Sequence, residues 1–349
     1  MTKKQIFSTT YFLSGTLFLG FGYSIMINVA NYDAWISAIL GLLIGCSFVA
    51  LIGYINKQKG PDKLYDYLKN AKTFGFIMRI LLIIVSAFMF ILILANLEIF
   101  TSSFFFVHTP NYMVALPVII LMIIFAKNGL KCVGRVAEIL FIISLPIIIF
   151  ICTAFIQYID LDNIKPIMMA SNNQIALSTL FFAIFSATPY LLLLNTEDDG
   201  KYYVLGYIFT AFVSIIILFI IISVLGPTLM HLYQYPEYFV LKKFKVFGFL
   251  ERIENIVSII WIFNCIITLA CSSVMIKDLF PKKGQNITFP IFTIILFLIS
   301  TYTINHSAIF HSYSKYVPYP LLIGFFIIVI PLSIYSFKKN KEHKKMKEN

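Results

Sequence analysis

The chain has 349 residues, of which 60% are hydrophobic and 12% charged, with a mean hydropathy of +0.89 and a formal net charge of +11. A soluble globular protein carries about 25% charged residues, so this composition excludes that class and predicts a polytopic membrane protein. The positive charge does not indicate nucleic-acid binding, because the basic residues are scattered through loops and the C-terminal tail rather than gathered in one domain.

Ten apolar stretches can be drawn as membrane spans, given that about 20 residues of helix cross the hydrocarbon core. They are 6–30, 34–56, 76–103, 111–126, 136–158, 176–195, 202–226, 254–276, 287–305 and 318–337. With both termini in the cytoplasm, most of the 27 basic residues fall on the inner side, as the positive-inside rule expects. The sequence therefore predicts an all-α integral membrane protein with ten transmembrane helices. It forms a single membrane domain over residues 1–338, followed by a basic cytoplasmic tail, 339–349.

The first span, Ile6 to Ala30, is long and apolar but makes a poor continuous helix. Gly15, Gly20 and Gly22 lie in its middle, and each costs about 1 kcal/mol of helix propensity relative to alanine. A lipid-facing helix would gain nothing from this, because backbone groups freed by unwinding find no water in the bilayer core. The glycines indicate a break that neighbouring helices or a small polar cavity would stabilise.

Span six contains the matching segment, Leu177 to Asn195. Pro189 removes a backbone donor there, and Ala187 and Thr188 precede it directly. Interrupted helices at corresponding places in two halves of a chain point to a binding site near the middle of the membrane. The alternative is that the small residues and the proline only serve close helix packing.

Ten spans divide into five and five. Because each half has an odd number of crossings, the two halves must run in opposite orientations through the membrane. We therefore expect an inverted repeat, with repeat one at about 6–158 and repeat two at about 176–337, in which helices 1 and 6 are the broken ones.

Polar groups inside the predicted spans are the candidates for function. Glu98 in span three either faces the cavity, as a substrate or proton group, or extends to the outer interface. In span eight, Trp261, Asn264, Thr268 and Ser272 recur at helical spacing and so share one face. That face could contact a small polar ligand, or bond to neighbouring helices, which is the commoner event.

Catalytic and metal chemistry find little support in the sequence. The five histidines lie in loops, at span ends or in the tail, and the five cysteines include no C-x-x-C pair. No carboxylate pair and no nucleophile beside a base is evident. We expect no enzyme activity, no catalytic residue, no metal and no cofactor.

Four polar motifs follow one another along the chain. They are LGFG at 19–22, NYDAW at 31–35, GLKCVGRVAEI at 129–139 and YPEYFVLKKFKVFGFLERIENIVSIIW at 235–261, in which FGFLERIE followed by a tryptophan is the most specific part. In these motifs, over nearly its whole length, the chain resembles the spore germination permease family. That family comprises the B subunits of nutrient germinant receptors, within the amino acid–polyamine–organocation superfamily.

The resemblance implies a LeuT-like fold of two inverted five-helix repeats with broken helices 1 and 6. It also implies a multi-pass subunit of the spore inner membrane, or of the bacterial cell membrane, that senses a small nutrient, typically an amino acid. Its partners would be A-type and C-type germinant receptor subunits and the lipid bilayer, with no nucleic acid. The alternative is a secondary amino acid transporter (permease) working by alternating access, and an integral membrane transferase ranks last for want of catalytic groups.

The resemblance also implies where the ligand binds. Gly20 and Gly22 would offer exposed backbone to it, and span eight around Thr268 and span three near Glu98 would complete the pocket. The expected ligand-binding set is Thr16, Gly20, Gly22, Glu98, Ala187, Thr188, Trp261, Asn264 and Thr268. In span six the chain departs from the family, whose members often have a glycine and a glutamate where Ala187 and Pro189 stand, so the ligand's polar contacts are expected to differ there.

Overall fold

The computed structural model describes residues 1–60, 64–194, 201–243, 253–282, 285–305 and 315–348. The described residues are mostly helical and include no strand. Nine stretches among them are long and apolar enough to cross a membrane, and large apolar side chains such as Leu43 and Ile142 are exposed on the outside of the bundle. An apolar outer surface of this extent suits lipid rather than water, so the chain is a multi-pass membrane protein.

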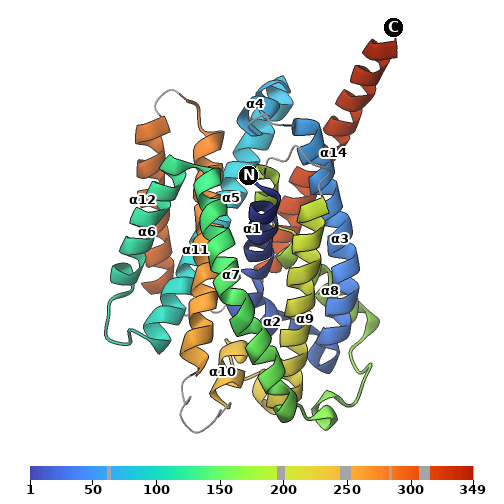
Figure 1. The fold of residues 1–349 in the computed structure, drawn as a ribbon, viewed down its shortest axis with the longest axis vertical. Helices are drawn as coiled ribbons and strands as arrows, with labels where there is room; N and C mark the ends of the chain where they lie inside the picture. The colour runs from blue at the N-terminus through green and yellow to red at the C-terminus, as the bar shows by residue number, and fades with distance from the viewer. Residues whose placement is uncertain (61–63, 195–200, 244–252, 283–284, 306–314, 349) are drawn as a thin grey trace.

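The helices pack side by side in one bundle (Figure 1). In chain order they are α1 (Lys3–Gly15), the π-helical turn η1 (Phe18–Gly22), α2 (Tyr23–Ala30), the 3₁₀ turn η2 (Asn31–Asp33), α3 (Ala34–Lys59), α4 (Leu64–Lys69), α5 (Lys72–Phe104), α6 (Asn111–Asn128), α7 (Leu130–Ala154), η3 (Phe155–Tyr158), η4 (Leu161–Ile164), α8 (Asn172–Ser186), η5 (Pro189–Leu193), α9 (Lys201–Met230), α10 (Pro236–Lys242), α11 (Ile253–Leu279), α12 (Gln285–Asn305) and α14 (Pro318–Glu348).

The first membrane stretch contains both predicted spans one and two. Lys3–Lys59 has 57 residues, which would be about 85 Å long as a straight helix, far more than a bilayer core of about 30 Å. The backbone leaves helical conformation at Asn31 (φ 50°, ψ −125°), and α3 runs back alongside the bundle from that point (Figure 1). The tight turn at η2 joins α2 to α3 almost without a gap. The predicted spans 6–30 and 34–56 therefore lie in one apolar stretch, which is why nine stretches appear where ten spans were predicted.

The buried Asp33 fastens this turn to a distant loop. Its carboxylate accepts hydrogen bonds from the backbone nitrogens of Met168 and Ala170, at 2.7 and 2.8 Å.

The two chain termini lie at the end of the bundle that carries α4, and α10 lies at the opposite end (Figure 1). Beyond the bundle, α14 continues as a projecting helix that includes most of the basic tail.

Both predicted helix interruptions are confirmed. Leu19 (φ −76°, ψ 121°) and Gly20 (φ 88°, ψ −22°) leave helical conformation inside η1. In the second half, α8 ends at Ser186, and Ala187 (φ −104°, ψ 68°) and Thr188 (φ −73°, ψ 145°) form the gap before η5. Glycine is required at position 20, because a positive φ is strained for any residue with a side chain.

The end of α3 holds the short helix that follows the second break. Asn56 Nδ2 donates to the carbonyl oxygen of Leu191 at 2.7 Å, and Lys59 Nζ donates to that of Leu192 at 2.5 Å. Both polar side chains are buried, at 0% and 3% exposure. Carbonyls that a continuous helix would have bonded internally are therefore bonded by side chains of a neighbouring helix.

Candidate functional site

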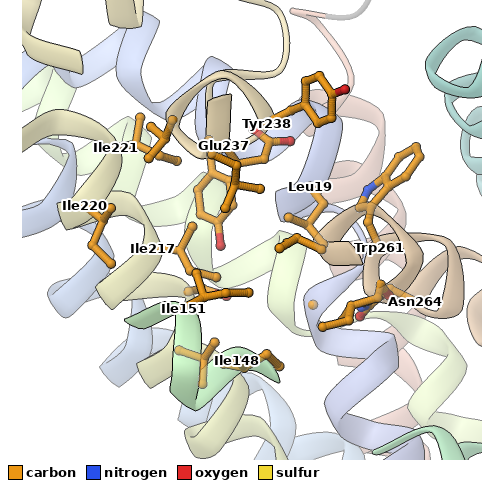
Figure 2. Close-up of a pocket in the computed structure, with 18 of the residues that line it drawn as sticks. Leu19, Ile148, Ile151, Ile217, Ile220, Ile221, Glu237, Tyr238, Trp261 and Asn264 are labelled. Atoms are coloured by element: carbon orange, nitrogen blue, oxygen red, sulfur yellow. Dashed lines mark hydrogen bonds between the residues drawn. The ribbon is translucent and has the colours of Figure 1, made fainter. Parts of the chain in front are cut away.

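A cavity lies beside the first helix break. It is lined by parts of α1, η1, α2, α5, α7, α9, α10 and α11, and the space open to the centre of a water molecule is about 120 Å³. Figure 2 shows isoleucines of α7 and α9 on one side, Trp261 and Asn264 of α11 on the other, and Glu237 and Tyr238 of α10 at one end. Because a water molecule takes up about 30 Å³ in the liquid, the cavity has room for about four water molecules, or a small solute.

The backbone groups freed at the first break are bonded by side chains from other elements. Gly20 N–H donates to Glu237 Oε1 at 2.7 Å. The carbonyl oxygen of Leu19 accepts a long bond of 3.4 Å from Asn96 Nδ2, and Asn96 Oδ1 in turn accepts from the Tyr235 hydroxyl at 3.0 Å. The unwound turn is therefore fixed by α5 and by the segment that carries α10.

Glu237 is the one acidic or basic side chain among the described residues that line the cavity. Its second carboxyl oxygen, Oε2, is buried and has no hydrogen-bond partner among the described residues. Burial raises the pKa of Glu237 to about 7, although the hydrogen bond from Gly20 N–H opposes that shift. Trp261 Nε1, on the same cavity, is likewise buried without a partner in the described part of the chain.

Aromatic rings close the cavity where α10 packs. The ring of Phe100 lies 4.2 Å from that of Trp261 and 5.4 Å from that of Tyr238, measured between centroids. Lys242, one turn further along α10, places its amine 4.8 Å from the Tyr238 ring and 5.3 Å from the Phe104 ring. Such cation–π and ring contacts hold α10 against α5 and over the end of the cavity.

The structure brings some of the sequence-predicted residues to this cavity. Trp261 and Asn264 line it, and Gly20 adjoins it through its bond to Glu237. Thr16 and Thr268 instead join two helices: the Thr16 hydroxyl lies 2.5 Å from that of Thr268 and 3.1 Å from the backbone oxygen of Asn264. These two threonines hold the end of α1 against α11 and do not line the cavity.

The remaining predicted residues lie elsewhere. Glu98 is fully buried on α5 and accepts a hydrogen bond from Ser300 of α12 at 3.1 Å. Gly22 allows close packing, since a Cβ there would lie 3.0 Å from the backbone oxygen of Leu17 and from the Phe18 ring. Ala187 and Thr188 are buried at the second break and do not line this cavity.

Sequence reasoning missed Glu237. It lies in the segment 228–252 between the predicted spans 202–226 and 254–276, where the sequence analysis named no site residue, and part of this segment (244–252) lies outside the described residues. A usable signal was present, because a single carboxylate follows a proline among aromatic residues in the QYPEYF run. Its partner, Gly20, is 217 residues away, so only the fold reveals the pair.

The Thr16–Thr268 contact gives a first testable expectation. Replacing either threonine by valine should lower the free energy of unfolding, and the double mutant should lose about 1 kcal/mol less than the sum of the single losses, because one shared hydrogen bond is removed in each case. Thermal unfolding of the purified protein in detergent measures all four variants. Strictly additive losses would mean that the two hydroxyls do not interact.

Comparison with known proteins places the chain among spore germination proteins. Residues 1–309 match a family model described as "Spore germination protein". The chain is 24% identical over 243 residues to the putative spore germination protein YfkT of Bacillus subtilis, an alignment that covers 68% of this chain and 67% of that one. It is 25% identical to spore germination protein A2 (88% and 87% covered) and 24% identical to spore germination protein KB (91% and 90% covered) of the same organism.

Proposed function

The chain belongs to the spore germination protein family, and on that premise we propose that it is the membrane subunit of a spore nutrient-germinant receptor. In this proposal a small nutrient, in the first instance an amino acid, binds in the cavity beside the first helix break. Binding triggers germination by shifting the helix bundle between two conformations. Such a shift requires that the nutrient bind one conformation more tightly than the other.

The observation that carries the proposal is the cavity itself. It is of the size of a small amino acid, it adjoins an unwound membrane helix, and it contains buried polar atoms that have no partner among the described residues. Trp261 and Asn264 belong to the proposed binding set, and Glu237 is added to it. Thr16, Gly20 and Thr268 would act by holding the unwound turn and α11 in place.

A LeuT-like arrangement of ten crossings in two inverted repeats, at 6–158 and 176–337, is the fold we propose for this function. Three observations support it. The chain reverses at Asn31, each half begins with an interrupted helix, and the two termini lie at the same end of the bundle (Figure 1). In this proposal both termini, with the tail 339–349, are cytoplasmic, and the membrane is the spore inner membrane or the bacterial cell membrane.

We propose A-type and C-type germinant receptor subunits as the partners. The alternative function is a secondary amino acid transporter, since a cavity beside broken helices would also serve alternating access. Uptake of labelled amino acids into proteoliposomes separates the two. Concentrative flux by the isolated chain would favour the transporter, and binding without flux would favour the receptor.

Cys152 offers a direct test of nutrient binding, because it lines the cavity whereas Cys132 does not. With the nutrient at ten times its Kd, modification of Cys152 by a small maleimide should slow about tenfold, because only about one site in eleven remains empty. Cys132, which is also partly buried, is the internal control and should react at an unchanged rate. Mass spectrometry of the labelled peptides measures both rates in one sample, and equal rates for Cys152 with and without every amino acid tested would contradict the proposed site.

A further inference from the structure

The charge distribution of the cavity discriminates between the two ends of an amino acid. Among the described lining residues there is no lysine, arginine or histidine. The other titratable groups on the described lining are Tyr11 of α1, Tyr23 of α2, Cys152 of α7 and Tyr238 of α10, and Tyr235, beside the cavity, also interacts with Glu237. These are phenols and a thiol, none of which can carry a positive charge. A charged ligand would therefore meet one charge, the carboxylate of Glu237.

This cavity offers few hydrogen-bond donors to a ligand carboxylate. The backbone donor freed by the helix break, Gly20 N–H, is already bonded to Glu237 Oε1 at 2.7 Å. Trp261 Nε1 is the remaining buried donor on the cavity that has no partner in the described chain. Two carboxylates close together in a low-dielectric site repel each other, and no cation on the described part of the lining compensates.

The cavity offers both an acceptor and aromatic rings to a ligand ammonium group. Glu237 Oε2 is a buried acceptor with no partner among the described residues, and a charge-assisted bond to it is worth about 1.5–3 kcal/mol. The rings of Phe100, Tyr238 and Trp261 lie next to that carboxylate end of the cavity and attract cations through their faces. The opposite wall carries isoleucines of α7 and α9, which suit a small aliphatic body (Figure 2).

We propose that this cavity recognises its ligand by an ammonium group bound to Glu237 Oε2, and that a ligand carboxylate is dispensable. The ligand class is a small primary amine with a short, branched aliphatic body, of which an aliphatic amino acid is one member. This inference rests on the proposed function, because it concerns the same cavity.

Protonation of Glu237 should compete with such a ligand. Since burial raises the pKa of Glu237 to about 7, the ionised fraction of the carboxyl group rises about tenfold between pH 6 and pH 8. The affinity for isobutylamine, whose amine stays charged throughout that range, should therefore rise about tenfold over the same interval. The E237Q variant should remove this pH dependence.

The test uses the purified full-length chain and four probes that share one branched aliphatic body: L-valine, L-valinamide, isobutylamine and N-acetyl-L-valine. Protection of Cys152 from maleimide measures the affinity of each. Valine, valinamide and isobutylamine should bind with affinities within about tenfold of one another, and N-acetylvaline, which has no ammonium group, should bind at least about tenfold more weakly than valine. E237Q should weaken the three amines about tenfold or more, whereas the control E98Q, at a buried carboxyl group that does not line the cavity, should not.

Three outcomes would overturn the inference or its premise. If valine and N-acetylvaline bind equally well and isobutylamine does not, the cavity is still the nutrient site and only the ammonium assignment is wrong. An unchanged affinity of E237Q for isobutylamine leads to the same conclusion; if E237Q does not fold, the four-probe series and the pH profile of the unmodified chain decide. If none of the four probes and no amino acid protects Cys152, the proposed function itself is wrong.

Discussion

Replacing Gly20 by leucine is expected to abolish the nutrient response while leaving insertion into the membrane intact. Gly20 has φ 88°, a conformation that strains a residue with a side chain by about 1–3 kcal/mol. In addition, a Cβ at this position would overlap the amide group of Asn96, which bonds Leu19 and Tyr235. The leucine would therefore displace Asn96 and break its hydrogen bonds to the Leu19 carbonyl and the Tyr235 hydroxyl, which fix the unwound turn beside the cavity.

The measurement is the germination of spores that carry the variant, as a function of nutrient concentration, together with immunodetection of the chain in the spore membrane fraction. The matched control is Gly53→Leu on α3, because a Cβ at Gly53 meets no atom within 4 Å. We expect a normal dose–response curve for Gly53→Leu. A normal curve for Gly20→Leu, at equal amounts in the membrane, would show that the first helix break has no part in nutrient sensing.

Replacing Lys59 by methionine is expected to lower the free energy of unfolding by about 3 kcal/mol. Methionine keeps the length and apolar stem of the side chain but leaves the buried carbonyl oxygen of Leu192 without its donor. A buried carbonyl oxygen that loses its donor costs up to about 3 kcal/mol, because no water replaces the lost hydrogen bond.

Thermal unfolding of the purified protein measures this loss. Lys127→Met is the matched control, because Lys127 also lies in the last turn of a membrane helix, α6, but is exposed. The control should unfold at nearly the temperature of the unmodified chain, since exposed lysines contribute little. If the two variants unfold at the same temperature, Lys59 does not hold η5, and the second break is stabilised by Asn56 and by packing.

Much of the architecture could be predicted before the structure was seen. The membrane class follows from composition, and the two interruptions follow from Gly20 and Pro189, because glycine and proline weaken a helix wherever they stand. The gap between the predicted spans 6–30 and 34–56 coincides with the turn at Asn31–Asp33, but the chain turns there within three residues, so both predicted spans lie in one continuous stretch. The count of ten crossings stays a prediction.

The candidate site was harder to predict, because spacing along one helix says which residues share a face but not what that face meets. Trp261, Asn264 and Thr268 do share a face of α11, yet the first two line the cavity and the third contacts Thr16. Glu98 was singled out as an acid inside a span, but its neighbour is Ser300 of α12. Each outcome depends on helix packing, which the period of a single helix does not encode.

Three features of this protein follow from its sequence alone. They are its apolar membrane helices, the two places where a helix is interrupted, and the small number of charged residues inside the membrane. Tertiary packing alone decided where Glu237 lies, the one carboxylate on the part of the lining that the structure describes, because it meets Gly20 across 217 residues of chain. A backbone N–H that is freed inside the bilayer must be hydrogen-bonded by another part of the protein. The glycine at position 20 predicts the freed N–H, but the identity of its acceptor depends on the tertiary structure.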